Sequence, residues 1–316
     1  MPSPQIGCGV SYPPTNQNMV TRTAMPWLQL KCSAPPHYVD ELSEWLMARG
    51  ALSVTYEDAA AQPLYEPPPG QTPLWQQTVV TGLFEASTDI DAVSRALQLH
   101  AAGNIDHLRS EILEDKDWVR EWMSRYQPMQ FGDSLWIVPS HHTPPDPEAV
   151  NILLDPGLAF GTGTHPTTAM CLEWLANHPP LSQVVVDYGC GSGILAIAAA
   201  KLGASQVIAV DNDPQALLAT AENATHNQVG ATIVCQDVDE PIQTQCDTLL
   251  ANILAGPLMG LAPRFAEFVR PGGKIVLSGI LAEQAETVRH AYASWFEFQL
   301  TQQQDEWILM NAIRKP

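Results

Sequence analysis

Short hydrophobic patterns along the first third of the chain predict an alternation of strands and helices. Residues 38–47 and 90–99 carry apolar side chains in the pattern of helices. Four strand-like runs lie before, between and after these helices, at residues 27–33, 52–57, 78–85 and 107–113. The resulting βαββαβ order is that of a ferredoxin-like α+β sandwich, which we expect at residues 25–105.

From about residue 151 onward, short apolar runs alternate with helix-length segments. Such runs suit strands that are buried on both faces, so the pattern predicts an α/β domain with a doubly wound parallel sheet. Residues 296–302 and 306–312 differ, because their tight connection predicts an antiparallel hairpin. A parallel sheet closed by such a hairpin is typical of the class I methyltransferase fold. The buried strands are expected at residues 184–187, 207–211, 232–236, 248–253 and 274–278.

Two stretches lack the pattern of a folded domain. Residues 1–24 are rich in Pro, Asn, Gln, Ser and Thr, so we expect a disordered extension with too little apolar surface to bury. Residues 106–150 are interpreted as a linker between the folded parts, because the proline-rich run 144–147 interrupts regular structure. Within this stretch, Trp118 and Trp122 lie one turn apart on a predicted helix and are expected to pack against a neighbour.

Composition narrows the class of protein. A chain of 316 residues with 45% hydrophobic residues buries a substantial core and suits two domains, the second spanning residues 151–316. Its six cysteines include no C-x-x-C spacing, so neither a zinc site nor a disulfide framework is expected. No run approaches the roughly 20 apolar residues that span a bilayer, and no signal peptide is recognisable. We therefore expect a cytoplasmic protein with no membrane segment.

The charge of the chain is strongly acidic. Its 34 Asp and Glu residues and 15 Lys and Arg residues give a formal net charge of -19. Such a field repels phosphates, so no direct nucleic-acid partner is expected. The same charge suits a basic protein substrate, since opposite potentials raise the encounter rate, and it equally suits solubility alone.

The strongest candidate for a binding site is a glycine-rich turn at residues 187–193. Gly189, Gly191 and Gly193 occupy alternate positions where the first buried strand passes into its helix, so a ligand can approach the backbone closely. The dinucleotide fingerprint requires a glycine at position 194, which is Ile194 here. The turn resembles the methyltransferase version, which cradles the methionine part of S-adenosylmethionine. A purely structural glycine-rich turn is the alternative.

Acidic residues end the next two strands. Asp211 lies about 20 residues after the glycine turn, where a carboxylate binds the ribose diol of a nucleotide. Asp213, followed by Pro214, is better explained as a helix N-cap. Asp237 is expected either near an adenine ring or in a turn.

Asn252 follows the fourth strand, at the edge of the sheet where ligands bind. Many amine and amide methyltransferases place Asn or Asp here, followed by two prolines and an aromatic residue. The Asn oxygen and a nearby backbone carbonyl then align the acceptor nitrogen. Because Ile253 and Leu254 replace the prolines, the role of Asn252 as catalytic residue is better defined than the carbonyl geometry.

A run of small and hydroxyl-bearing residues at 153–168 precedes the catalytic sheet. We expect the part from Phe160 to Thr168 to close over cofactor and substrate. His165 lies in this run without Cys, Asp or Glu at ligand spacing, so no metal site is expected.

Several stretches together closely resemble the PrmA family, bacterial methyltransferases of large-subunit ribosomal protein eleven. The resemblance implies a small substrate-recognition domain at 25–105 and methylation of α-amines and lysine ε-amines. It also implies contacts to S-adenosylmethionine by Thr168, Gly189, Asp211 and Asn252. Since residues 1–24 have no counterpart in the family, Met25 is favoured as the start, and we expect a monomer. The resemblance rests on Met25-Pro26-Trp27, Glu114-Asp115-Lys116-Asp117-Trp118, Arg120-Glu121-Trp122-Met123, residues 154–168 and 186–197, Asp211, residues 251–258, and Ser278-Gly279-Ile280-Leu281-Ala282.

Other functions remain open from the residues themselves. A small-molecule or RNA methyltransferase uses the same chemistry, whereas a NAD-dependent oxidoreductase or a catalytically silent binding module belongs to a different class. Ile194 argues against dinucleotide binding, and Asn252 argues against a silent site.

Overall fold

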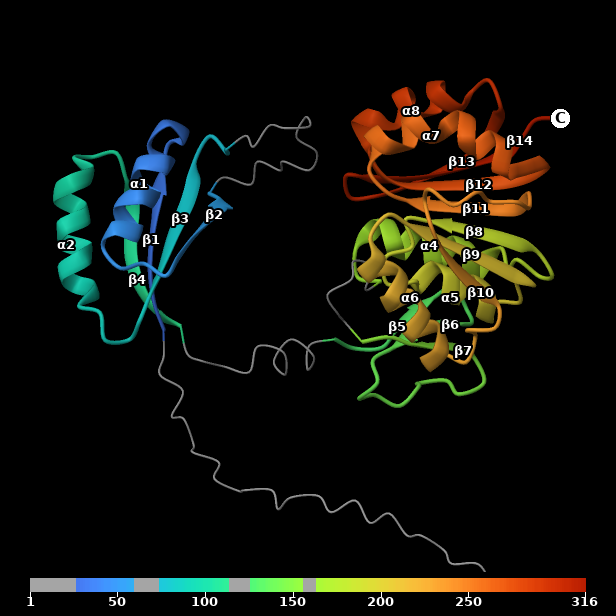
Figure 1. Ribbon diagram of the computed structural model, residues 1–316, viewed down its shortest axis with the longest axis horizontal. Coiled ribbons are helices and arrows are strands. Elements are labelled where there is room, and N and C mark those ends of the chain that lie inside the picture. Colours follow the sequence, from blue (N-terminus) through green and yellow to red (C-terminus); the bar gives the residue numbers. More distant parts are fainter. Residues whose placement is uncertain (1–26, 60–73, 114–125, 156–162) are drawn as a thin grey trace, which may run out of the picture. The chain divides into compact units, whose positions relative to one another are not determined.

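The computed structural model describes residues 27–59, 74–113, 126–155 and 163–316. The chain divides into two compact units, Met1–Asp117 and Trp118–Pro316 (Figure 1). The predicted extension at 1–24 lies outside the described residues, as do Trp118 and Trp122.

The first unit contains one antiparallel sheet with the strand order β2-β3-β1-β4. This order interleaves two split β-α-β units, and the predicted βαββαβ sequence of elements is the observed one. The elements are β1 (Trp27–Ala34), α1 (Pro36–Ala48), β2 (Ser53–Asp58), β3 (Thr78–Phe84), α2 (Ile90–Ala101) and β4 (Asp106–Leu113).

The core of the first unit lies between this sheet and its two helices. Leu30 and Phe84 from the sheet, Leu42 and Leu46 from α1, and Leu97 from α2 belong to one buried cluster.

Helix α2 begins at an N-cap, because the Asp89 carboxylate accepts a hydrogen bond from the Ala92 N–H at 2.9 Å.

The structure corrects the predicted linker at 106–150. Residues 106–113 form β4 of the first sheet, whereas residues 129–153 carry three strands of the second unit. The proline-rich run 144–147 lies in a loop between two of these strands, so prolines mark a connection within a unit here. The strands of this small sheet are β5 (Met129–Phe131), β6 (Leu135–Val138) and β7 (Val150–Leu153).

The second unit is built on a seven-stranded sheet with the order β10-β9-β8-β11-β12-β14-β13. The first five strands in this order are parallel, and β14 and β13 complete the sheet as an antiparallel hairpin, as predicted. This is the class I methyltransferase fold. The strands are β8 (Val184–Tyr188), β9 (Gln206–Asp211), β10 (Ile233–Asp237), β11 (Cys246–Asn252), β12 (Val269–Leu281), β13 (Phe296–Gln304) and β14 (Trp307–Arg314).

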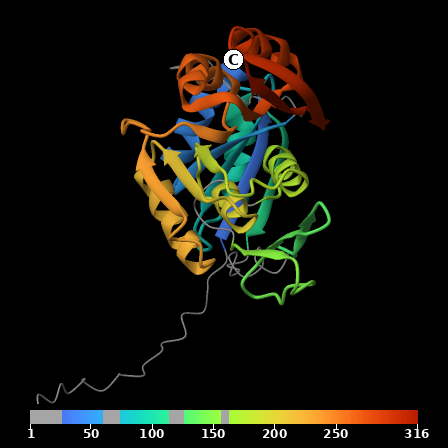
Figure 2. The same ribbon diagram turned by 90° about the vertical axis from the view of Figure 1, so that its right-hand side faces the viewer.

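Helices cover both faces of this sheet. Successive strand residues alternate between two buried clusters, with Val185 and Leu250 facing α4 and α5, and Val186 and Leu249 facing α7 and α8. Figure 1 shows the parallel strands β12, β11, β8, β9 and β10 side by side, and Figure 2 shows the same unit turned by 90°. The helices are α4 (Pro166–Asn177), α5 (Ile194–Lys201), α6 (Pro214–His226), α7 (Ala255–Phe268) and α8 (Ala285–Tyr292), with a 3-10 turn at Ala282–Gln284.

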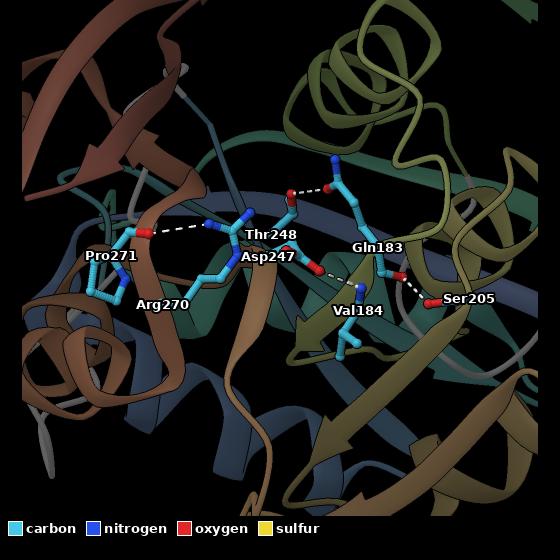
Figure 3. A network of polar contacts seen from close by, with 7 residues as sticks. All are labelled: Gln183, Val184, Ser205, Asp247, Thr248, Arg270 and Pro271. Carbon is cyan, nitrogen blue, oxygen red and sulfur yellow. Dashed lines mark hydrogen bonds and ion pairs between the residues drawn. The ribbon is translucent and has the colours of Figure 1, made fainter. Parts of the chain in front are cut away.

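A polar network ties the amino-terminal ends of the parallel strands together (Figure 3). The Asp247 carboxylate accepts hydrogen bonds from the Val184 N–H at 2.8 Å and from Arg270 at 2.6 Å. Burial alone would raise the pKa of Asp247, but these two donors lower it below its usual value. Ligands bind at the opposite, carboxyl ends of such strands, so this network supports the sheet away from the predicted site.

Candidate active site

The carboxyl ends of the central strands bring most of the predicted site residues to one edge of the sheet. Asp211 ends β9, Asn252 ends β11, and the glycine turn follows directly after β8. Strand pairing places Ala251 opposite Tyr188 and Asn252 opposite Ser278. Residues far apart in the sequence therefore converge where open α/β sheets bind ligands.

The glycine turn adopts a conformation that few other residues tolerate. Gly189, Gly191 and Gly193 have φ angles of +80°, +54° and +79°. A Cβ atom at Gly189 would collide with the Ile253 side chain, and one at Gly193 would lie 2.8 Å from Thr220 Cγ2. The predicted need for glycine thus has two causes here, backbone conformation and close packing.

Asp187 anchors the helix that follows the turn. Its buried Oδ2 atom accepts a hydrogen bond from the Ala196 N–H at 2.9 Å, whereas Oδ1 has no hydrogen-bond partner among the described residues. Burial raises the pKa of Asp187 to about 7, the Ala196 bond opposes this shift, and the nearby Asp211 adds to it. The carboxyl group therefore titrates near neutrality.

Asp211 braces the glycine turn as well as facing the candidate cofactor site. Its Oδ2 atom accepts a hydrogen bond from the Gly191 N–H at 2.9 Å, and Oδ1 accepts one from the Asp213 N–H at 3.1 Å. Gly191 thus contributes to the shape of the turn, with its N–H engaged by Asp211. Asp213 is the N-cap of α6, as predicted, because its carboxylate accepts from the Gln215 N–H at 2.9 Å.

A pocket of about 390 Å³ lies beside Asp211. Its walls are largely apolar, and the Asp211 carboxylate is the acidic group among them, a combination that suits a nucleoside with an aromatic base and ribose hydroxyls. Asp237 ends β10, and its carboxylate accepts a hydrogen bond from the Asp239 N–H at 2.9 Å in the turn that follows. The pocket is lined by Tyr188, Gly189, Asp211, Asn212, Val238, Ile253, Leu254, Pro257, Leu261 and Arg264.

Asn252 and Thr168 meet although they come from separate predicted stretches. The Asn252 Nδ2 atom donates a hydrogen bond to Thr168 Oγ1 at 3.1 Å. Thr168 lies in the first turn of α4 and is buried. This bond fixes one side of the Asn252 carboxamide and turns its Oδ1 atom the other way.

His165 has a structural role at the start of α4. Its Nδ1 atom accepts from the Thr167 N–H at 3.4 Å, and its ring packs edge-on against Trp307 with centroids 5.0 Å apart. Burial lowers the pKa of His165, and Glu306 opposes this effect. Among the described residues, no group of three or more His, Cys, Asp or Glu side chains is arranged to hold a metal ion.

Phe160, assigned to closure over the site, lies outside the described residues. Thr220 and Asn223 on α6 were not predicted, yet the Thr220 hydroxyl donates to the Gly191 carbonyl at 3.1 Å and the Asn223 amide donates to the Ser192 carbonyl at 2.9 Å. No sequence motif marks these residues, because their contacts depend on how α6 packs beside the turn.

Similarity to known proteins extends over nearly the whole chain. The sequence model described as ribosomal protein L11 methyltransferase (PrmA) matches residues 26–315. The chain belongs to this family. A ribosomal protein L11 methyltransferase of Marinobacter nauticus is 52% identical over 300 residues, covering 92% of this chain and 99% of the relative. The Nitrosococcus oceani protein of the same name is 50% identical over 292 residues, covering 92% of this chain and 100% of the relative.

A solved structure supports the same assignment. The crystal structure of a ribosomal protein L11 methylase from Lactobacillus delbrueckii subsp. bulgaricus is 34% identical, with a TM-score of 0.54. The match covers 60% of this chain and 100% of that chain. Family membership makes this PrmA-family chain an S-adenosylmethionine-dependent methyltransferase, which sets aside the oxidoreductase and the silent binding module. No helix among the described residues is long and apolar enough to cross a membrane.

Proposed function

We propose that this chain transfers methyl groups from S-adenosylmethionine to the α-amine and lysine ε-amines of ribosomal protein L11. The observation that carries the proposal is the near full-length similarity to relatives named for methylation of that protein. The Asn252–Thr168 pair at the ligand-binding edge of the sheet supports an amine as the acceptor, because a carboxamide oxygen accepts hydrogen bonds from N–H groups.

The glycine turn and the adjacent pocket are the proposed binding site of the cofactor. When bound, S-adenosylmethionine supplies a methyl group carried on a sulfonium. Gly189 leaves room for close approach to the backbone, and Asp211 offers a carboxylate to ribose hydroxyls at the edge of the pocket. Thr168, Gly191 and Asn252 complete the proposed set of contacts, together with Phe160, which lies outside the described residues.

Asn252 is the proposed catalytic residue because it aligns the acceptor amine. In-line displacement requires the nitrogen lone pair to point at the methyl carbon at about 3 Å. Since Thr168 holds the Nδ2 side of the Asn252 carboxamide, Oδ1 is oriented to accept a hydrogen bond from the amine. The orientation of the carboxamide is thus set before the substrate arrives.

The acceptor lysine must lose a proton before it attacks. With an ordinary pKa of about 10.4, deprotonation at pH 7 costs about 4.6 kcal/mol. Burial of the amine in a partly desolvated site disfavours the ammonium form and lowers this cost, and water carries the proton away. No side chain is therefore assigned as a dedicated base.

The first unit is proposed to select the protein substrate, and the second to bind the cofactor. Each unit has its own sheet and core, so recognition and chemistry are carried by separate folded parts. The formal charge of -19 favours encounter with a basic protein.

The proposal is tested by incubating the enzyme with labelled S-adenosylmethionine and one acceptor at a time. We expect label in unmethylated ribosomal protein L11, and background incorporation in ribosomal RNA and in the sample without acceptor. Label in RNA alone would favour an RNA methyltransferase and contradict the proposed acceptor.

A further inference from the structure

Strand β12 contains a β-bulge next to the proposed site of methyl transfer. Leu277 pairs with Met310 and Ile280 pairs with Ile308, so Ser278 and Gly279 together face the one intervening residue of β14. A bulge re-aims the backbone locally. Here it lies beside Asn252, which pairs with Ser278 on the other side of β12.

Gly279 packs against the backbone that follows Asn252. Its φ angle is +82°, and a Cβ atom there would collide with the Ile253 carbonyl oxygen and lie 2.8 Å from the Ile253 carbonyl carbon. Gly189 approaches the same residue from the glycine turn, where a Cβ atom would collide with the Ile253 side chain. Ile253 is therefore confined between two glycine backbones.

Ser278 contacts the backbone of Thr167, the residue before Thr168 in α4. Its side chain is fully buried, and its Oγ atom lies 3.3 Å from the Thr167 carbonyl oxygen and 3.4 Å from the Ile308 carbonyl oxygen. The single hydroxyl proton is shared by these acceptors. Thr167 immediately precedes Thr168, so Ser278 links β14 and β12 to the first turn of α4.

We propose that the Ser278–Gly279 bulge is a positioning element for methyl transfer. Gly279 restrains the Ile253 carbonyl beside Asn252, and Ser278 restrains the helical turn that carries Thr168. A proline after Asn252 would fix the backbone through its ring, whereas Ile253 leaves φ free, so close packing supplies the restraint. The inference rests on the proposed role of Asn252 and adds the residues that keep it in place.

A pair of alanine substitutions on one strand separates the proposed contact from general backbone strain. Gly272 also lies on β12 with a φ of +75°, but the nearest atom to a Cβ there is Arg270 Nη1 at 3.8 Å. Gly272→Ala and Gly279→Ala both place a side chain at positive φ, and only Gly279→Ala forces Ile253 to move. We expect Gly279→Ala to lower kcat at least tenfold with saturating S-adenosylmethionine and substrate, and Gly272→Ala to retain wild-type kcat.

A second variant and a readout without substrate keep the proposal testable if Gly279→Ala folds poorly. Ser278→Ala removes the hydroxyl donor, and we expect kcat to fall about threefold while the Kd of S-adenosylmethionine stays within twofold. With asparagine-selective ¹⁵N labelling, the Asn252 side-chain amide signal should shift or broaden in Ser278→Ala and Gly279→Ala but remain in Gly272→Ala. Asn252→Asp identifies this signal by its loss.

The outcomes distinguish this inference from the proposed function. If Gly279→Ala and Ser278→Ala leave both kcat and the Asn252 signal as they are in Gly272→Ala, the positioning role is wrong. If Asn252→Ala retains full kcat, the proposed role of Asn252 fails instead. If ribosomal protein L11 is not methylated at all, the acceptor fails, and the amide signal still decides whether the bulge positions Asn252.

Discussion

The side-chain amide of Asn252 donates a hydrogen bond to the hydroxyl of Thr168, 84 residues earlier in the chain, at 3.1 Å. This bond joins the end of β11 to the first turn of α4 at the carboxyl edge of the sheet. The bond orients the Asn252 carboxamide, which we propose aligns the acceptor amine for methyl transfer.

Thr168→Val should lower kcat by about two- to tenfold, since it removes the acceptor of this bond while keeping the shape of the side chain. A neutral hydrogen bond contributes about 0.5–1.5 kcal/mol, which sets the expected size of the effect. Steady-state kinetics on the folded variant measure it. Thr225→Val is the matched control. Thr225 is exposed, and its hydroxyl donates a hydrogen bond to the Ala221 carbonyl of its own helix at 2.9 Å, away from Asn252. Equal kcat for the two variants would contradict the role of Thr168.

Asp211→Ala should weaken binding of S-adenosylmethionine by about 1.5–3 kcal/mol, the range for a hydrogen bond to a charged group. The expected loss has two sources, the proposed ribose contact and the hydrogen bond that supports Gly191. Asp213→Ala is the control, because Asp213 caps α6. Loss of this cap should lower the free energy of unfolding by about 1 kcal/mol without changing cofactor affinity. Calorimetric titration of both variants checks the prediction, and unchanged affinity in Asp211→Ala removes it from the ribose site.

Asp187 should make the free energy of unfolding depend on pH between about 4 and 7. Burial raises its pKa in the folded chain from 3.8 to about 7, so the folded state binds a proton in this range that the unfolded state has already lost. Stability should therefore fall as pH rises through this window, by about 1.4 kcal/mol per pKa unit of difference. Asp187→Asn should show a flatter profile in denaturant titrations at several pH values. Identical profiles for the two proteins would show that Asp187 is ionised throughout.

A fragment that begins at residue 118 should bind S-adenosylmethionine with nearly unchanged affinity and fail to methylate intact ribosomal protein L11. Its start follows the boundary between the two compact units and keeps strands β5 to β7, which a start at the predicted linker end would remove. Calorimetry and the methylation assay test the two halves of this prediction. Methylation of ribosomal protein L11 by the fragment at the rate of the full-length enzyme would contradict the recognition role proposed for the first unit.

Local sequence signals predicted the parts of the site that lie at strand ends. Asp211 and Asn252 end short buried strands and Gly189 directly follows one, and such strands end at one edge of a parallel sheet. The contacts of Gly279 with Ile253 and of Thr220 with Gly191 were not predictable, because they join elements that are distant in the sequence and depend on packing. The linker was misplaced because proline-rich composition marks loops within a unit as readily as boundaries between units.

The most direct test starts from unmethylated ribosomal protein L11, incubated with S-adenosylmethionine and either the wild-type enzyme or Asn252→Ala. Peptide mapping by mass spectrometry then locates the methyl groups that were added. We predict whole methyl increments on the α-amine and on lysine side chains with the wild-type enzyme, and a large loss of these increments with Asn252→Ala. Methyl groups on other side chains, or equal methylation by the two enzymes, would contradict the proposed alignment of an amine by Asn252.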